Sequence, residues 1–363
     1  MSQTVRLPTR SGSAPAVSPR RGPVCVHRDV SDGAWDAYVG RHPDASGYHL
    51  TAWTRIIASA FRHRVCRLVA ESDRGIEGVL PLVLFRSRLF GRFAVSLPFL
   101  NYGGIIAESP EAERALLDAA IDECLQGGAS HLELRHSRRL FADLPCKRHK
   151  VAMVLPLEKT PDGQWKALDR KVRNQIRKAE KSGMTSLAGG SELVPVFYEV
   201  FARNMRDLGT PVYAMRFFEE VVSTLPDRTR VFCVYAGSRP VAASIVHVHR
   251  DIVEVPWASS LREFSAQAPN MLLYWQMLQF AIGRSAQSFD FGRSTPGEGT
   301  FHFKRQWGAA PQELVWEYWT APGVPLPDLS PANPGYRRAI ALWQRLPVPL
   351  AKLAGPPIVR NIP

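Results

Sequence analysis

Cysteine is scarce in this sequence and occurs in none of the spacings that cysteine-based sites need. The chain of 363 residues has five cysteines, which are scattered and form no Cys-x-x-Cys pair. This set argues against a structural zinc site and against a disulfide framework, and it fits a reducing cytoplasm. Cys233 lies in an apolar stretch, so we expect its thiol to be unreactive.

Long apolar runs are missing as well. No segment approaches the roughly 18 consecutive apolar residues of a membrane-spanning helix, and the basic, Ser- and Pro-rich segment 1–24 has no apolar core of a signal peptide. We expect a disordered tail there and a cytoplasmic protein. Residues 322–363 are Pro-rich and then basic and amphipathic, which fits either packing on the protein itself or peripheral contact with an anionic inner membrane.

Acidic residues are outnumbered by basic ones. The counts are 33 Asp and Glu against 46 Lys and Arg, a formal net charge of +13. The excess favours an anionic partner, which could be nucleic acid, a phosphorylated substrate or an anionic lipid surface. Because 363 residues are many for a single hydrophobic core, we expect two domains.

Signatures of nucleophilic and metal-dependent catalysis are absent. No Gly-x-Ser-x-Gly elbow and no Ser, His, Asp series is apparent. His247 and His249 are two residues apart and would share one face of a strand, but no third ligand accompanies them. We therefore expect no metal site and no permanently bound cofactor.

The stretch from Phe289 to Ala309, FDFGRSTPGEGTFHFKRQWGA, is the most informative part of the chain. It begins as an alternating strand that breaks at Gly292, continues as a glycine-rich loop and ends in an aromatic and basic run around Lys304. A carboxylate near a strand end, Asp290, followed by a flexible loop and a cation among aromatics, is typical of polar chemistry in a dry pocket. A strand, a tight loop and a packed aromatic cluster would give the same pattern without any chemistry.

The predicted elements occur in the same order twice. Each half is expected to contain a strand, its hairpin partner, a third strand, a helix, another strand and a closing strand. Glu133 and Asp290 fall at matching places in the two halves, as do Pro98 and Pro256. The expected elements are 65–71, 75–87, 93–104, helix 113–128, 130–137 and 151–157 in the first half, and 231–237, 240–250, 251–260, helix 268–286, 287–294 and 313–319 in the second.

This order predicts an α/β (α+β) fold of two tandem units, each a mixed sheet flanked by helices. A helix, a turn and a second helix precede each set of strands. We expect the disordered tail to be followed by a first unit at 25–158, by a basic helix and second unit at 159–321, and by the C-terminal tail at 322–363.

A strongly basic helix is predicted between the units, from Gly163 to Gly183. Its apolar residues share one face at about 100° per residue, and five cations share another face. Like charges four residues apart repel by roughly a few tenths of a kcal/mol per pair, so the stripe favours contact with phosphates, such as those of RNA. A solvated helix face is the alternative, although Glu180 alone interrupts the cations. The five are Lys166, Arg170, Arg173, Arg177 and Lys181.

With these features in view, the chain resembles the FemAB family of peptidyl and aminoacyl transferases, within the GNAT-like acyltransferase superfamily. It is most similar to the FemAB-like branch that accompanies exosortase/PEP-CTERM exopolysaccharide systems of bacteria. The resemblance runs from about Gly78 to Trp319 and rests on stretches that are specific only together. They are GVLPLVLFRSRLFGR, SLPFLNYGG, HLELRH, KVRNQIRKAEKSG, VFARNMRDLGTPVY, EVPWASSLR, PNMLLYW and FDFGRSTPGEGTFHFKRQWGA.

The resemblance implies transfer of an acyl or aminoacyl group to an amine or hydroxyl of a cell-envelope or exopolysaccharide precursor. In studied members the donor is aminoacyl-tRNA, the acceptor is a peptidoglycan precursor, and a basic residue that matches Lys304 serves the acceptor or the transition state. The helical hairpin that some members use for tRNA is not apparent. SSLREFSAQAPN stands where acetyl-CoA-dependent GNAT enzymes carry a glycine-rich pyrophosphate loop. Aminoacyl-tRNA, acyl-CoA and an acyl carrier protein therefore all stay open as donors.

Acyl transfer from an activated donor needs positioning, a proton acceptor and stabilisation of an oxyanion. Our hypothesis makes Asp290 the base or the carboxylate that orients the acceptor, and Lys304 the group that stabilises the oxyanion or a phosphate. Glu133 is expected to be structural, with Arg135 or His136 as its partner. Further candidates, which would contact substrates or else serve only as packing and ion-pair residues, are Arg293, Ser294, Glu254, Trp257, Asn204, Asp207 and Tyr213.

Two other functions are compatible with the sequence. One is an N-acyltransferase that uses acyl-CoA or an acyl carrier protein and acts on an amino sugar or a similar acceptor. The other is a non-catalytic protein that binds RNA or a membrane surface through the basic helix, for which steep salt dependence without turnover would be the sign.

Overall fold

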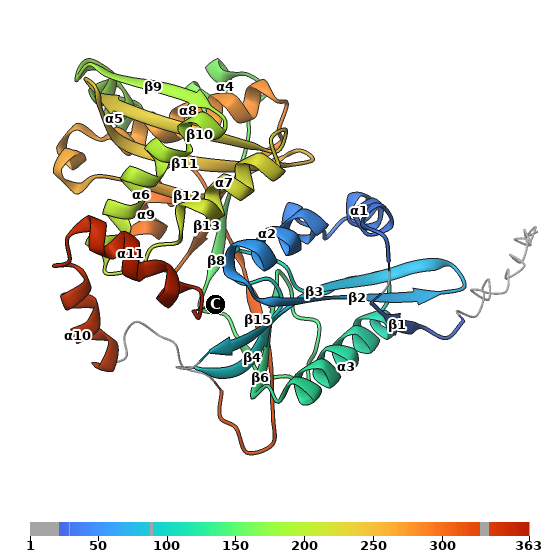
Figure 1. Cartoon of the computed structure of the whole chain (residues 1–363). Helices are drawn as coiled ribbons and strands as arrows, with labels where there is room; N and C mark the ends of the chain where they lie inside the picture. The colour runs from blue at the N-terminus through green and yellow to red at the C-terminus, as the bar shows by residue number, and fades with distance from the viewer. Residues whose placement is uncertain (1–21, 29, 88–89, 327–333, 363) are drawn as a thin grey trace, which may run out of the picture.

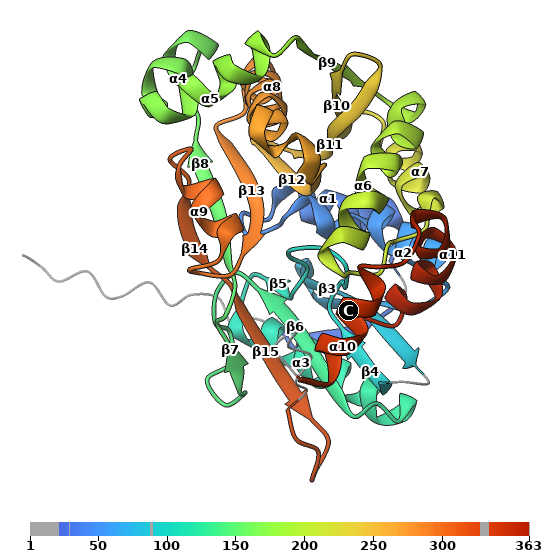
Figure 2. The same ribbon diagram turned by 90° about the vertical axis from the view of Figure 1, so that its left-hand side faces the viewer.

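The chain forms two mixed β-sheets with helices on their faces, so the predicted fold class is confirmed (Figures 1 and 2). The computed structural model describes residues 22–28, 30–87, 90–326 and 334–362. Most of the expected tail at 1–24 therefore lies outside the described residues. No described helix is long and apolar enough to cross a membrane.

The first sheet has the strand order β1-β2-β3-β4-β6-β15-β7, with β5 paired to β3. Its neighbours pair antiparallel except β4 and β6, which run parallel. Helix α3 packs against one face, and α1 and α2 lie on the other. The strands are β1 (Cys25–His27), β2 (Arg64–Ser72), β3 (Gly75–Ser87), β4 (Gly91–Val95), β5 (Ile106–Ala107), β6 (His131–His136), β7 (Cys146–Lys147) and β15 (Val315–Thr320).

Local chemistry sets the ends of α3 (Pro110–Gly127). Ser109 caps its N-terminus by accepting a hydrogen bond from the backbone N–H of Ala112, and Pro110 takes a first-turn position that needs no donor. Gly128 ends the helix at φ 64°, a left-handed conformation that glycine adopts without steric cost. The end predicted for this helix, at residue 128, is therefore confirmed.

The second sheet has the order β14-β8-β13-β12-β11-β10-β9, and β12 and β13 form its parallel pair. Helices α4, α5, α8 and α9 cover its outer face, and α6 and α7 cover the face that looks toward the first unit. The strands are β8 (Val151–Pro156), β9 (Met184–Gly189), β10 (Thr229–Ala236), β11 (Arg239–His249), β12 (Ile252–Ser260), β13 (Ser288–Ser294) and β14 (Ala310–Glu313).

A continuous apolar core joins the two units. It contains residues of the first sheet, the second sheet and the four helices between them. Phe61 of α2 stacks on Phe99 at 4.1 Å between ring centroids and packs on Phe217 of α7 at 4.9 Å. The helices and 3-10 turns here are α1 (Asp32–Arg41), η1 (Gly47–His49), α2 (Thr51–Phe61), η2 (Ser191–Leu193), α6 (Val194–Leu208) and α7 (Met215–Thr224).

Two strands are exchanged between the units. Strand β8 follows the first unit in the chain but pairs with β13 and β14 of the second sheet. Strand β15 follows the second sheet but pairs with β6 and β7 of the first. The prediction that each strand closes its own half was wrong, because an alternating apolar strand does not specify which sheet it joins.

The strand expected at 287–294 is confirmed, but the break predicted at Gly292 was wrong. Strand β13 does not break there but continues to Ser294, with a register shift against β8 between Asp290 and Arg293. Gly292 has φ +75°, and a Cβ added to it would lie 2.8 Å from the carbonyl oxygen of Val255, so only glycine fits this bulge. The aromatic and basic run forms helix α9 (Gly299–Arg305).

The predicted basic helix is divided in two. Helix α4 (Pro161–Ala167) ends at Leu168, and Asp169 caps α5 (Arg170–Lys181) by accepting from the N–H of Lys171. Lys166 therefore lies on a different helix from the other four predicted cations. Both helices pack against α8 (Pro269–Gly283), which follows the 3-10 turn η3 (Arg262–Gln267).

The C-terminal tail folds back on the second unit as α10 (Pro334–Trp343) and α11 (Val348–Val359). Helix α11 packs on α6. The carbonyl oxygen of Arg360 lies 2.6 Å from Nε2 of His63 in the first unit. The tail therefore contacts both units.

Candidate active site

Strands β12 and β13 run parallel over a short distance and then part. Their register ends at the pair Glu254↔Asp290. Beyond it, the two strands line a cavity of about 430 Å³, which we call the splay cavity. Its lining is Asn101, Lys150, Val255, Pro256, Ala258, Tyr274, Phe291, Gly292, Arg293, Ser294, Thr295, Thr300 and Lys304.

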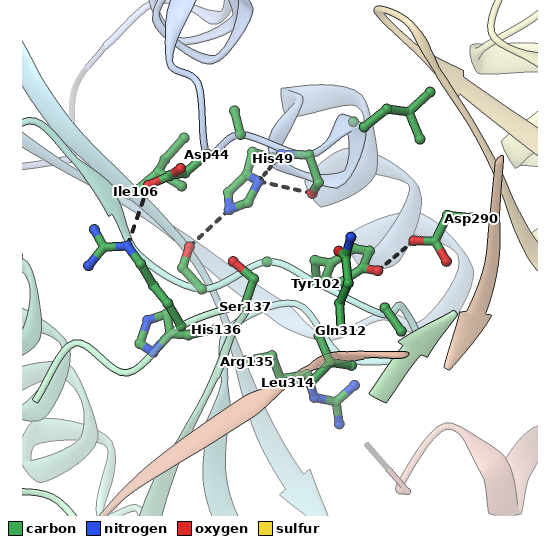
Figure 3. Close-up of a pocket in the computed structure, with 18 of the residues that line it drawn as sticks. Asp44, His49, Tyr102, Ile106, Arg135, His136, Ser137, Asp290, Gln312 and Leu314 are labelled. Atoms are coloured by element: carbon green, nitrogen blue, oxygen red, sulfur yellow. Dashed lines mark hydrogen bonds and ion pairs between the residues drawn. The ribbon is translucent and has the colours of Figure 1, made fainter. Parts of the chain in front are cut away.

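A second cavity, of about 380 Å³, lies between the units, and we call it the inter-unit cavity (Figure 3). Its walls include Asp44, His49 and Tyr102 from the first unit, with Glu254 and Asp290 from the second. Glu254 and Asp290 line the inter-unit cavity, whereas the next residues on the same strands, Val255 and Phe291, line the splay cavity. The two cavities therefore adjoin at Glu254 and Asp290.

Asp290 is 4% exposed and is held from two sides. The backbone N–H of Gly292 donates to its Oδ1 at 2.7 Å, and the hydroxyl of Tyr102 donates to its Oδ2 at 2.5 Å. Figure 3 shows this tyrosine reaching Asp290 from the first unit. Burial raises the pKa of Asp290 above its ordinary value, although these hydrogen bonds and the charge of Lys304 oppose the shift. A buried carboxylate held in this way is positioned to accept a proton.

Glu254, the partner of Asp290 across the strands, is buried and linked to Arg293. Asn101 donates through Nδ2 to Glu254 Oε1 at 2.6 Å and accepts from Nε of Arg293 at 2.8 Å. Burial and the neighbouring Asp290 raise the pKa of Glu254 well above its ordinary value. Burial and the charge of Asp290 thus both favour the protonated form of Glu254.

Lys304 enters the splay cavity from α9. Its Nζ donates to the carbonyl oxygens of Gly292 at 3.0 Å and Arg293 at 2.7 Å. Burial lowers the pKa of Lys304 to about 8. An ammonium group has three N–H donors, so one remains for a ligand in the cavity.

The splay cavity is cationic and contains an unpartnered hydroxyl. Burial, together with the charge of Arg135, lowers the pKa of Arg293 to about 10, and its guanidinium lies 5.3 Å from the ring centroid of Trp316. Nζ of Lys150 donates to Thr295 at 2.7 Å. Ser294 is 4% exposed, and its Oγ has no partner within the described structure. These groups could bind a phosphate or a developing oxyanion.

The structure does not bring every predicted substrate residue to the cavities. Trp257 packs in the shared core against Phe217 and Phe218. Asn204 donates to Ser259 at 3.1 Å, and Asp207 pairs with Arg206. Neither of these two lines a cavity described above.

Tyr213 is placed differently from Asn204 and Asp207. Burial raises the pKa of its phenol, while the charges of Arg293 and Arg135 oppose the shift. Its ring packs on Phe61 and Phe99. Tyr213 therefore lies against the core that joins the two units, near the guanidinium of Arg293.

The basic surface at α4 and α5 consists of cations that are not paired with the acids nearby. Among the described residues, none of its five predicted cations forms an ion pair within 4.0 Å. Nε of Arg173 is buried without a hydrogen-bond partner, and Arg177 lies 5.3 Å from the ring centroid of Trp165. The other cations are exposed, which leaves them available to phosphates.

His247 and His249 both line the inter-unit cavity. Burial lowers their pKa values to about 3 and about 4, respectively, so both imidazoles are neutral at pH 7. In the described part of the chain, no three His, Cys, Asp or Glu side chains are grouped as metal ligands. The ring of His247 stacks on Tyr48 at 5.6 Å.

Sequence reasoning missed the first-unit residues of the site. Tyr102, Asn101 and Lys150 contact Asp290, Glu254 and Thr295, which are far away in the chain. The available signal was the stretch SLPFLNYGG, which ends with the asparagine, the tyrosine and two glycines.

Glu133, the predicted match of Asp290, is structural. Arg135 donates through Nε to its Oε1 at 2.7 Å, and the hydroxyl of Tyr318 donates to Oε2 at 3.0 Å. The predicted partner Arg135 is confirmed. His136 pairs instead with Glu317, at 2.8 Å.

The sequence of the second unit matches a known domain family. Residues 166–305 match the profile of the acetyltransferase (GNAT) domain. The predicted enzyme class, an acyltransferase, is thereby confirmed. The matched segment contains the parting strands, Asp290 and Lys304. No curated protein matches the chain.

Solved structures share the fold over most of the chain. FemX is 16% identical, with a TM-score of 0.63 over 80% of this chain and 96% of its own. The C-terminal domain of a protein described as a lysylphosphatidylglycerol synthetase, from Agrobacterium fabrum, is 11% identical, with a TM-score of 0.53 over 79% and 91%. L-PGS from Bacillus licheniformis is 11% identical, with a TM-score of 0.50 over 79% and 91%. The fold shared with these structures thus extends over both units.

Proposed function

We propose that this protein transfers an acyl or aminoacyl group to an amine or hydroxyl of a cell-envelope or exopolysaccharide precursor. The observation that carries the proposal is the meeting of two cavities at Asp290, one cationic and one between the units. Two substrates can approach this carboxyl from different cavities. The fold shared with FemX and with the lysylphosphatidylglycerol synthetase domain supports a transferase of this kind.

The donor is assigned to the splay cavity. Lys150, Arg293 and Lys304 supply positive charge there, and the hydroxyl of Ser294 is free to donate. The third N–H of Lys304 would hydrogen-bond the carbonyl oxygen of the donor as negative charge develops on it.

The acceptor is assigned to the inter-unit cavity. Its nitrogen or oxygen attacks the donor carbonyl carbon, the new bond forms, and the carbonyl π electrons move to oxygen. Asp290 takes the proton released by the nucleophile, while Tyr102 holds the carboxylate in place. Collapse then breaks the bond from the carbonyl carbon to the leaving oxygen or sulfur, which takes up a proton.

The exposed cations of α5 favour aminoacyl-tRNA as the donor. A helix face that carries Arg170, Arg177 and Lys181 without carboxylate partners suits a polyphosphate chain better than a single thioester. The match to an acetyltransferase domain favours the second candidate, an N-acyltransferase that uses acyl-CoA or an acyl carrier protein. The exosortase/PEP-CTERM setting is part of the proposal and rests on the sequence resemblance.

The test is a transfer assay on the purified full chain. Radiolabelled aminoacyl-tRNAs, acyl-CoAs and acyl carrier protein thioesters would each be mixed with nucleotide-linked amino sugars and peptidoglycan precursors. We expect one donor class to be consumed only when an acceptor is present, and Asp290→Asn to slow the transfer by about 10²- to 10⁴-fold. The proposal would be contradicted if protein that mass spectrometry shows to be intact turned over none of these donors with any acceptor.

A further inference from the structure

The C-terminal helices α10 and α11 are basic and contain no acid. From residue 334 to the end, the sequence has five basic and no acidic residues: Arg337, Arg338, Arg345, Lys352 and Arg360. Lys352 lies 5.2 Å from the ring centroid of Tyr198. Within the described structure, none of Arg338, Arg345, Lys352 and Arg360 is paired with a carboxylate at ion-pair distance.

Helix α11 has two apolar sides, and one of them faces solvent. Ala351, Gly355 and Val359, spaced four apart, are buried. At Gly355 an added Cβ would lie 2.7 Å from the backbone nitrogen of Val212, so this side is closely packed. The opposite side is exposed and has no charged residue: Leu350, Leu353, Ala354 and Pro357.

The exposed apolar residues extend beyond α11. Leu342 at the end of α10 is 67% exposed, and Leu350 and Leu353 are 50% and 76% exposed. Leu208 and Met215 are exposed at the ends of α6 and α7, on the turn that the tail packs against. The contacts that bring these segments together include Gln344 Nε2 to the carbonyl oxygen of Asp207 at 3.2 Å and Arg206 to that of Leu346 at 2.8 Å. We call the five exposed side chains the apolar patch.

We propose that the apolar patch docks on an anionic phospholipid bilayer. The leucines would enter the boundary between headgroups and acyl chains, and the surrounding cations would contact lipid phosphates. The tail helices carry basic and no acidic residues, and the one acid beside the patch, Asp207, is paired with Arg206, so the apolar face complements that surface. The N-terminal segment 1–21 has four arginines and no acid, so its charge does not complement that of the tail. This proposal does not rest on the proposed transferase function.

The experiment is co-sedimentation of the full chain with vesicles of phosphatidylcholine alone or mixed in equal parts with phosphatidylglycerol. We expect pelleting with the mixed vesicles only, weakened by added salt. The double variant Leu350→Gln/Leu353→Gln should lose about tenfold or more in partitioning, and Arg345→Gln on the order of fivefold. The matched control is Leu125→Gln/Leu187→Gln, two leucines on α3 and β9 that are 55% and 51% exposed, and it should bind like the unaltered protein.

Three results would overturn the proposal. They are absence of pelleting with the mixed vesicles, equal pelleting with neutral vesicles, and equal losses in the two double variants. Sedimentation velocity adds a fourth outcome. The protein could fail to bind vesicles and instead form a dimer that the double variant Leu350→Gln/Leu353→Gln disrupts. The apolar patch would then be an interface between copies of the chain.

Discussion

Glu133 and Asp290 occupy equivalent positions in the two sheets but have different partners. Each lies at the last register pair of the parallel strands of its own sheet. Two residues further along, the first unit has Arg135, which pairs with Glu133, and the second has Gly292, which gives Asp290 only a backbone N–H. The carboxyl of the second unit therefore has no guanidinium partner of its own and lines a cavity.

This difference predicts different effects of neutralising the two carboxyls. We expect Asp290→Asn to lower kcat/KM by about 10²- to 10⁴-fold, the contribution of a general base, and to leave folding intact. Glu133→Gln should instead lower the free energy of unfolding by about 1–3 kcal/mol, because it weakens buried hydrogen bonds. Transfer kinetics and urea unfolding of both variants check the assignment. Equal kinetic losses would contradict it.

Removing the ammonium of Lys304 should slow the chemical step. We expect Lys304→Met to lower kcat by about 10²- to 10³-fold, the loss typical of one oxyanion donor. Arg305, the next residue on α9, is exposed, so Arg305→Met is the matched control and should retain activity. Single-turnover kinetics separate this effect from donor binding, and an unchanged rate in Lys304→Met would remove Lys304 from the mechanism.

The pH dependence of kcat/KM should be bell-shaped. Activity needs Asp290 ionised, and burial raises its pKa, so the rate rises with pH above the ordinary carboxyl range. It also needs Lys304 protonated, whose pKa burial lowers to about 8, so the rate falls above about pH 8. Lys304→Arg should move the falling limb to higher pH, since guanidinium does not titrate there. A falling limb at the same pH in this variant would assign it to another group.

Glu254 should make the protein less stable as pH rises. Its folded-state pKa is raised, so its stabilising contribution is complete below the unfolded-state carboxyl pKa and is lost as pH rises through the folded value. The variant Glu254→Gln keeps a side-chain oxygen that can accept the hydrogen bond from Asn101. Because glutamine does not titrate, the loss of stability with rising pH disappears. We expect the variant to raise the free energy of unfolding at pH 8 by about 1 kcal/mol or more, with little change at pH 4. Urea unfolding at the two pH values measures the difference.

Helix α5 can be tested through the salt dependence of tRNA binding. We expect Arg170→Gln/Lys181→Gln to weaken binding and to reduce the slope of log K against log salt by about one for each lost phosphate contact. Arg284→Gln/Arg305→Gln removes the same charge from two exposed sites elsewhere and should have a smaller effect. If both double variants bind tRNA alike, α5 is not the binding surface.

Local patterns in the sequence predicted most of the elements, because hydrophobic periodicity is a local property, but the strand expected at 93–104 was wrong beyond Val95, where β4 ends. They did not predict that β8 joins the second sheet and β15 the first. The alternation of apolar and polar residues in these strands fits either sheet equally well. Local patterns also failed for Trp257. On β12, Glu254 pairs with His247 of β11 and Trp257 pairs with Ile245, with a register shift between the two pairs. Trp257 does not line a cavity with Glu254, because Trp53 of α2 and Phe217 of α7 pack against its ring.

The candidate site was predictable only on the side of the second unit. Asp290, Arg293, Ser294 and Lys304 lie within one short stretch, where strand, loop and cation are visible together. Tyr102 is 188 residues from the carboxyl it contacts, and such a separation leaves no periodic signal. The pairing depends on the packing of the two units.

The exchange of β8 and β15 has a consequence for how the protein is made on the ribosome. The first sheet is incomplete until residues 315–320 have emerged, because β15 separates β6 from β7. Glu317 of β15 is fully buried and accepts hydrogen bonds from the backbone N–H groups of Leu140 and Phe141. The first unit therefore keeps β6 unpaired on one edge until the second sheet and β15 have been synthesised.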